Sequence, residues 1–135
     1  MPAHGSDQRS AVKAIVLNAY GGPDVLELKE VGKPERCDRL KEISHKMHAG
    51  YRELGFNVGD SETPIVPVII GDLMLTFQMW KTLLQAGVYT NAVVPPAVAP
   101  GTARLRTSYM ATHTDEQLDR VLEVFGDVGK ELGVI

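Results

Sequence analysis

The first regular pattern along the chain is a pair of β-rich runs near the N-terminus. Residues Val12–Leu17 and Val25–Val31 are rich in aliphatic side chains, and the second run alternates strictly between apolar and polar positions. Such alternation is typical of a strand with one solvated face. The stretch Gly21–Asp24 between them favours a turn. We therefore predict a β-hairpin over residues 12–35, preceded by a disordered lead-in over residues 1–11.

The apolar spacing then changes to three and four residues. Between Arg36 and Leu54 this spacing predicts an amphipathic helix, which Gly55 would end. Its apolar positions are Leu40, Ile43, Met47, Tyr51 and Leu54. A second helix is predicted over Leu73–Ala86, with Asp72 as its N-cap and Gly87 as its end. We expect its buried stripe to include Leu73, Phe77, Trp80 and Leu84.

The last helix has the clearest local signal. Thr114 with Gln117 three positions later matches a capping box, and acidic residues follow the cap as the helix dipole favours. One apolar face then runs along this helix through Leu118, Val121, Leu122, Phe125, Val128 and Leu132. The pattern therefore predicts a third amphipathic helix that covers a core.

Three strands are predicted between these helices. Pro64–Ile70 is β-branched, but Pro67 has no N–H to donate, so we place it as an edge strand or as one paired through its second half. Val88–Asn91 and Ala103–Ser108 are further candidates, separated by a proline-rich loop over Val94–Gly101. The order ββ-α-β-α-β-β-α lacks regular βαβ units. We predict an α+β fold, a mostly antiparallel sheet with helices on one face.

Composition then narrows the class of function. The chain has 135 residues, of which 44% are hydrophobic and 23% charged, as in one ordinary globular domain. Fourteen basic residues against 17 acidic ones give a net charge of −3, which disfavours nucleic-acid and anionic-membrane partners. No apolar run approaches the roughly 20 residues of a membrane helix. The lead-in has no signal-peptide pattern and Cys37 is a single cysteine, so we expect a cytoplasmic protein.

Side chains for catalysis or metal binding are sparse. His45 and His48 lie at i, i+3 on the first predicted helix, with Cys37 two turns earlier. This spacing is compatible with a metal site, but no further ligand follows at metal spacing, and solvated surface histidines explain it better. Neither the serines nor Cys37 has a nucleophile signature around it.

Arg104 and Arg106 are the more informative pair. On a strand they point to one face and Leu105 to the other. Two guanidinium groups on one face suit bidentate capture of a carboxylate. Exposed arginines that form surface ion pairs are the alternative, and the pattern alone favours that alternative.

Residues from about Arg39 to Ile135 resemble the C-terminal domain of the α-oxoamine synthases, pyridoxal-phosphate enzymes that condense an amino acid with an acyl-CoA. The segments that carry the resemblance are, in chain order, Thr63–Asp72, Leu83–Tyr89, Pro95–Val98, Ala103–Arg106, Ala111–Thr114 and Gly129–Ile135. The resemblance implies the small C-terminal domain of a fold-type I enzyme over residues 36–135. It also implies that Arg106, the second arginine of the Arg-x-Arg segment, binds the carboxylate of the amino-acid substrate.

The segment Val12–Glu35 instead resembles the first hairpin of medium-chain quinone or alcohol dehydrogenases. No nicotinamide-binding unit or zinc-ligand sequence of that family follows, so the resemblance implies no oxidoreductase activity. The chain is thus predicted to be a chimera of two unrelated fragments.

The resemblance to the α-oxoamine synthases also indicates which parts of such an enzyme this chain lacks. In α-oxoamine synthases the lysine that holds pyridoxal phosphate and the groups around the cofactor ring belong to the large domain. None of the lysines here lies in such a motif, so we expect no cofactor in this chain and no catalysis by it alone.

Two hypotheses follow. In the first, the chain is a truncated or chimeric C-terminal domain of a pyridoxal-phosphate-dependent acyl-CoA:amino-acid C-acyltransferase, with its hairpin covering surface that the missing protein once covered. In the second, it is a self-associating interaction module, a homo-oligomer formed through an exposed sheet edge or by exchange of the hairpin.

Overall fold

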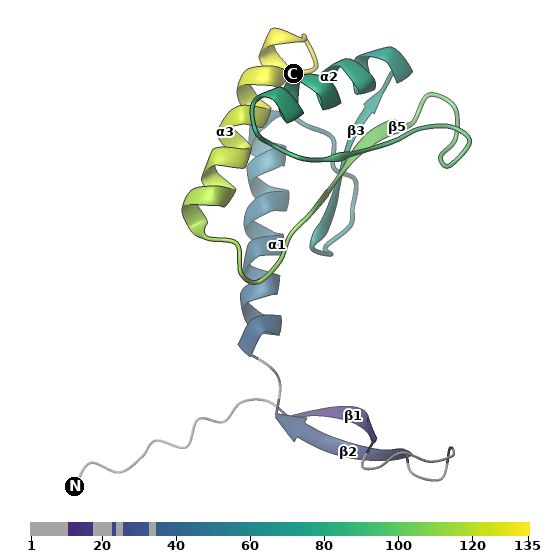
Figure 1. Ribbon diagram of the computed structural model, residues 1–135, viewed down its shortest axis with the longest axis vertical. Coiled ribbons are helices and arrows are strands. Elements are labelled where there is room, and N and C mark those ends of the chain that lie inside the picture. The colour runs from purple at the N-terminus through teal and green to yellow at the C-terminus, as the bar shows by residue number, and fades with distance from the viewer. Residues whose placement is uncertain (1–10, 18–22, 24–25, 33–34) are drawn as a thin grey trace, which may run out of the picture. The chain divides into compact units, whose positions relative to one another are not determined.

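A computed structural model describes residues 11–17, 23, 26–32 and 35–135 (Figure 1). Over these residues the chain alternates strands and helices in the predicted order, ββ-α-β-α-β-β-α. The chain divides into two compact units, residues 1–37 and 38–135, which we describe separately. The predicted lead-in and the glycines of the predicted turn lie outside the described residues.

The first unit contains the predicted hairpin. Strands β1 (Ala11–Leu17) and β2 (Leu26–Gly32) pair in antiparallel fashion, with Ile15 opposite Leu28. Both of these side chains are well exposed, at 70% and 68%. The hairpin prediction is therefore confirmed, and its two central cross-strand side chains are accessible.

Helix α1 (Glu35–Leu54) contributes one row of side chains to the core of the second unit. Ile43, Met47 and Tyr51 are buried, as the spacing predicts. The helix ends at Gly55, whose φ of 102° lets the next N–H, that of Phe56, donate to the carbonyl of Tyr51 at 3.0 Å. The predicted C-terminal signal is thus confirmed.

The three-stranded sheet has the order β3-β5-β4 and is antiparallel throughout. Its strands are β3 (Ile65–Gly71), β5 (Ala103–Ser108) and β4 (Asn91–Val93). Strand β3 is an edge strand, as Pro67 indicates, although it pairs from Ile65 to Gly71, with an irregularity at Ile70, rather than through its second half alone. Val66 and Val68 lie opposite Thr107 and Leu105, and these four side chains are all buried on the face that the helices cover.

The predicted strand over Val88–Asn91 is wrong in position, because β4 begins only at Asn91. Val88 instead completes the end of helix α2 (Leu73–Gln85), where its N–H donates to the carbonyl of Leu83 at 2.8 Å. Gly87, with φ of 87°, makes this Schellman closure possible. The backbone of Val88 is therefore used by the helix end and not by the sheet.

The predicted buried stripe of α2 is wrong for three of its four members, while Trp80 is half-buried and packs against the core. Thr76, Met79 and Leu83 face the core, whereas Leu73, Phe77 and Leu84 are exposed by 44%, 41% and 44%. Both sets recur at helical spacing, so periodicity alone does not tell which one is buried. The Asp72 cap is confirmed, since its carboxylate accepts the N–H of Leu75 at 2.7 Å.

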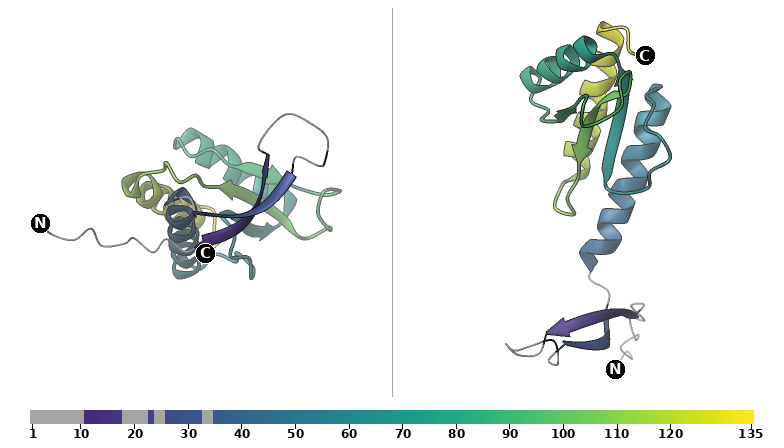
Figure 2. Two further views of the ribbon diagram at one scale, coloured as in Figure 1. Left: turned by 90° about the horizontal axis from the view of Figure 1, so that it is seen from below. Right: turned by 90° about the vertical axis from the view of Figure 1, so that its right-hand side faces the viewer.

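Helix α3 (Asp115–Glu131) begins with the predicted capping box and lies beside α1 (Figures 1 and 2). Gly129 of α3 lets this helix approach Phe56, which follows α1, because a Cβ at Gly129 would lie 2.5 Å from the Phe56 ring. That ring, Tyr51 and Phe125 make edge-to-face contacts with centroids 4.9–6.1 Å apart. This aromatic cluster closes the core between the helices.

Among the described residues, no helix is both long enough and apolar enough to cross a membrane.

Candidate functional site

The open face of the sheet carries the arginine pair. Arg104 lies between Ile69 of β3 and Val93 of β4, and Arg106 lies between Pro67 and Asn91. Since the neighbours of both arginines along β5 are buried, the arginines share the opposite, uncovered face. The prediction that their side chains point to the same side is therefore confirmed.

The two arginines differ in what they contact. Arg104 is half-buried and donates from Nε to the carbonyl of Thr102 at 3.0 Å. The side chain of Arg106 is exposed and has no hydrogen bond or ion pair with any other described residue. Arg104 is thus held by the chain itself, while the guanidinium group of Arg106 is available to a ligand.

The charge around Arg106 favours an anion. The three strands contribute no aspartate or glutamate, and their only charged residues are the two arginines. Their Cα atoms, two positions apart on one strand, are roughly 7 Å from each other. The open face is therefore a local positive site in a chain whose net charge is −3.

Next to the sheet lies a groove of about 720 Å³. Three segments line it, namely residues 87–90 before β4, residues 107–110 at the end of β5, and the start of α3 with its preceding loop. The groove has a size common for small-molecule sites. Its charged residues are Glu116 and Arg120, both exposed.

A buried pair of tyrosines lies behind one wall of the groove. The hydroxyl groups of Tyr51 and Tyr109 are 2.7 Å apart, and Tyr109 lines the groove. Burial raises the pKa of Tyr51 well above its ordinary 10.0 and also raises the pKa of Tyr109. Both phenols therefore stay protonated at neutral pH, as hydrogen-bonding groups and not as bases.

Two further polar groups complete the groove. His113 accepts the N–H of Met110 at Nδ1 at 3.0 Å, which leaves the proton of the neutral ring on Nε2. Thr90 is 2% exposed, and its hydroxyl has no hydrogen-bond partner among the described residues. The groove thus combines these two groups with the polar side chains of Ser108, Gln117 and Arg120 among largely apolar residues.

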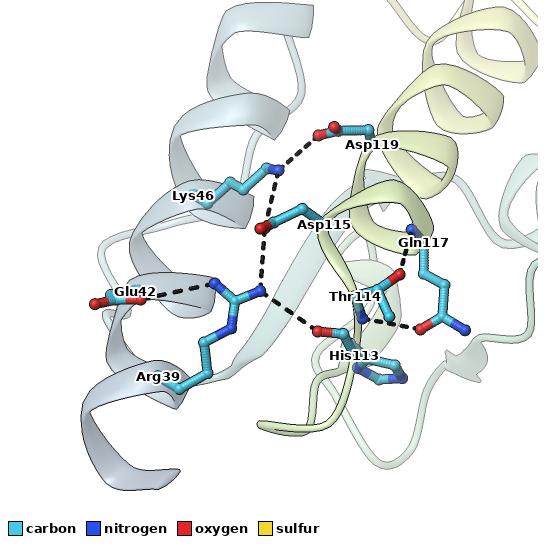
Figure 3. A network of polar contacts seen from close by, with 8 residues as sticks. All are labelled: Arg39, Glu42, Lys46, His113, Thr114, Asp115, Gln117 and Asp119. Atoms are coloured by element: carbon cyan, nitrogen blue, oxygen red, sulfur yellow. Dashed lines mark hydrogen bonds and ion pairs between the residues drawn. The ribbon is translucent and has the colours of Figure 1, made fainter. Parts of the chain in front are cut away.

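An ion-pair network fixes the loop that carries His113 (Figure 3). Arg39 of α1 donates to the carbonyl of His113 at 3.4 Å and to the carboxylate of Asp115 at 3.1 Å. Lys46 pairs with Asp115 and, at 2.7 Å, with Asp119. The hydrogen bond from Arg39 is the main cause that lowers the pKa of Asp115 below 3.8. The network therefore connects α1 to the first turn of α3.

The two histidines of α1 lie in different surroundings. His45 is exposed, but His48 is only 3% exposed and its Nε2 lies 2.9 Å from the carbonyl of Thr63. The prediction that both are solvated is thus wrong for His48, which connects α1 to the loop before β3. Cys37 is exposed. Across the described ranges, no three His, Cys, Asp or Glu side chains are grouped to hold a metal ion.

Covalent attachment of pyridoxal phosphate requires a lysine amine, so the positions of the chain's lysines are relevant. None of the groove residues is a lysine, and β3, β4 and β5 contain none. Lys46 instead forms ion pairs with Asp115 and Asp119. The open face and the groove therefore lack the amine that covalent attachment of this cofactor requires.

Sequence reasoning found the arginine pair but missed the groove. Thr90 lies 19 positions before Tyr109 and 23 before His113, in a separate loop, so no periodic pattern relates them. One available signal was Thr114, because its capping box places the preceding histidine at a helix N-terminus.

Comparisons with known proteins agree on one family. The family model described as aminotransferase class I and II matches residues 9–125. The 8-amino-7-oxononanoate synthase of Symbiobacterium thermophilum is 47% identical over 103 residues, which are 76% of this chain and 26% of the relative. The serine palmitoyltransferase of Caulobacter vibrioides is 43% identical over 105 residues, 78% of this chain and 26% of the relative. A high-resolution structure of SPT with PLP has a TM-score of 0.72 and 37% identity, over 75% of this chain and 26% of that one.

The chain thus spans about a quarter of the length of the curated relatives it matches. The range matched by the family model includes both strands of the hairpin. The resemblance of that hairpin to dehydrogenases stays a prediction.

Proposed function

The chain belongs to the aminotransferase class I and II family, and we propose that it is the part of an α-oxoamine synthase that binds the carboxylate of the amino-acid substrate. The relatives at 43–47% identity are a serine palmitoyltransferase and an 8-amino-7-oxononanoate synthase, so the proposed reaction class is condensation of an amino acid with an acyl-CoA. Since the chain spans about 26% of each, we further propose that it does not catalyse this reaction alone.

The observation that carries the proposal is the free guanidinium group of Arg106. It projects from a central strand whose other face is fixed in the core, so its backbone position is rigid. A guanidinium fork presents two parallel N–H donors to the two oxygens of a carboxylate. With no acidic residue on the three strands to compete, a substrate carboxylate is the partner that this face accepts.

The mechanism assigned to this chain is therefore positioning. Arg106 would neutralise and orient the substrate carboxylate, and the hydrogen bond from Arg104 to the carbonyl of Thr102 would fix the strand beneath it. Orienting one reactant contributes to rate by reducing the entropy cost of reaching the reactive geometry. The cofactor would be held by protein outside this chain, because the described residues of the open face include no lysine.

Titration by NMR tests whether Arg106 binds carboxylates. We expect the Nε–Hε resonance of Arg106 to shift with added sodium acetate and with glycine, without reaching saturation, since one exposed ion pair contributes only about 0–1 kcal/mol. The Arg104 resonance is the internal control, because its Nε–H already donates to Thr102. Methylammonium chloride at the same ionic strength controls for salt. Equal shifts of both arginines, or none at Arg106, would contradict the proposal.

A second assay tests the lack of independent activity. The purified chain, mixed with pyridoxal phosphate, an amino acid and an acyl-CoA, should form no condensation product. Product formation at a rate above that of a heat-unfolded sample would show that the chain is an enzyme by itself.

A further inference from the structure

Arg106 has a polar neighbour on only one of the two strands beside it. In the register of β4 and β5, Asn91 lies directly opposite Arg106, so both side chains project from the open face with Cβ atoms about 4.5–5.5 Å apart. Pro67 of β3 lies opposite Arg106 on the other side, and its ring carries no hydrogen-bond donor. A second donor from a neighbouring strand therefore has to come from the β4 side.

Asn91 holds a tyrosine at this place. Its Nδ2 donates to the phenol oxygen of Tyr89 at 3.2 Å. Because Asn91 projects from the open face, this hydrogen bond keeps the Tyr89 hydroxyl on the same face as Arg106. The Tyr89 side chain is 71% exposed, whereas Tyr51 is fully buried. The hydrogen bond to Asn91, and not packing in the core, therefore sets where the Tyr89 hydroxyl lies.

The hydroxyl of Tyr89 keeps its own proton for another acceptor. A phenol oxygen can accept one hydrogen bond and donate another, and here it accepts from Asn91. Within the parts of the chain that the structure describes, this hydroxyl makes no other hydrogen bond. The open face thus presents a guanidinium group and a phenol O–H on neighbouring strands, and both are donors that suit a carboxylate.

From this arrangement we infer that Tyr89 is a second donor to the carboxylate that Arg106 binds, and that Asn91 positions it. The inference rests on the proposed function, because it concerns the same carboxylate. An arginine fork occupies only two of the roughly four lone-pair positions of a carboxylate, so a phenol O–H can bind at the same time. The additional hydrogen bond would fix the orientation of the carboxylate as well as increase its affinity.

The contact is built within this chain. The positions of Asn91 and Arg106 follow from the register of β4 and β5, and that of the Tyr89 hydroxyl follows from one hydrogen bond to Asn91. The full chain by itself is therefore sufficient to test the inference.

The first test uses the unaltered chain with sodium acetate as the probe. NMR follows the Nε–Hε resonance of Arg106 and, in isotope-labelled protein, the Cζ resonance of Tyr89. Both resonances should shift in proportion to each other as acetate is added, with sodium chloride at equal ionic strength as the control. A Tyr89 resonance that stays fixed while Arg106 shifts would overturn the inference and leave the proposed function intact. No shift at Arg106 would contradict the proposed function and this inference with it.

Removal of one hydroxyl measures the contribution of the contact. Tyr89→Phe keeps the exposed ring and should lower the initial slope of the Arg106 shift against acetate about two- to tenfold, as for loss of one hydrogen bond. Tyr109→Phe is the matched control, because its hydroxyl faces Tyr51 in the core, and it should leave the slope unchanged. An unchanged slope in Tyr89→Phe, or an equal loss in both variants, would overturn the inference.

A double-mutant cycle tests the positioning role of Asn91. Asn91→Ala alone should also lower the slope, since the phenol is then free to turn away from Arg106. In the Tyr89→Phe background the same change should have no further effect, because Asn91 acts through the Tyr89 hydroxyl. Equal effects of Asn91→Ala in both backgrounds would exclude this positioning role.

Discussion

The two faces of the three-stranded sheet are built from alternating residues of the same strands, yet they serve different ends. On the covered face Val66, Val68 and Leu105 are 0% exposed and belong to the hydrophobic core. On the open face the side chain of Arg106 is exposed and has no hydrogen bond or ion pair with another described residue. One face therefore stabilises the fold, and the other presents a charge that the fold does not need. On β5 the core residue Leu105 and the proposed binding residue Arg106 are direct neighbours in sequence.

The largest expected effect on stability comes from truncating a side chain on the covered face of the sheet. Leu105→Ala should lower the free energy of unfolding by about 2–5 kcal/mol, because it leaves a cavity in a closed core. Its neighbour on the same strand provides the comparison, since Arg106→Ala should change stability by no more than about 0.5 kcal/mol. Urea unfolding followed by circular dichroism measures both. Similar losses in the two variants would show that the open face is part of the stabilising structure.

A smaller effect on stability is expected at the hydrogen-bonded pair of Tyr51 and Tyr109. Tyr51→Phe removes the 2.7 Å contact with Tyr109 and should reduce stability by about 0.5–1.5 kcal/mol at pH 7. Because burial raises both phenol pKa values in the folded state, the unfolded chain loses these protons first as pH rises past 10.0. The stability they contribute is thus present below pH 10 and lost above it.

Thermal unfolding between pH 8 and pH 11 tests this linkage. The decline above pH 10 should be shallower in Tyr51→Phe than in the unaltered chain, since one raised phenol pKa has been removed. Parallel curves would show that the buried tyrosines do not control the alkaline limit.

The smallest effect is expected at the exposed network of Figure 3. Arg39 lowers the pKa of Asp115, so this carboxylate contributes stability above its unfolded pKa, and that contribution is lost as pH falls through the lowered folded value. Asp115→Asn should therefore slightly lower the melting temperature at pH 7, with the difference shrinking below pH 3.8. Asp127→Asn, at an exposed position of the same helix, is the matched control for removal of one carboxylate. A constant difference at all pH values would assign the effect to helix capping instead.

Local sequence signals predicted most of the fold. Thr114 with Gln117, Asp72 before α2 and Gly55 after α1 each act within a few residues, so the sequence contains all of their interaction partners. The strand alternation around Arg104 and Arg106 likewise follows from backbone geometry alone. Element order, the α+β class and the arginine face were therefore predictable.

The predictions that failed concern features that depend on contacts between segments distant in the sequence. Leu73 and Phe77 were predicted to be buried because helical spacing identifies an apolar arc but not the neighbour that covers it. His48 is buried beside Thr63, 15 positions away, whose backbone carbonyl accepts a hydrogen bond from its Nε2. The groove required Tyr109 and Thr90 to converge from separate loops, and no local pattern encodes that convergence.

The central claim is that Arg106 binds a substrate carboxylate within a larger enzyme. A graft tests it, in which residues 38–135 replace the matching quarter of the Caulobacter vibrioides serine palmitoyltransferase. Activity of the unsubstituted graft establishes that it folds, and Arg104→Ala is the matched control. The measurement is the KM for the amino-acid substrate. We predict that Arg106→Ala raises this KM by about 10- to 100-fold, as expected for loss of a charge-assisted hydrogen bond, while Arg104→Ala has a much smaller effect. An active graft in which Arg106→Ala leaves the KM unchanged would contradict the account.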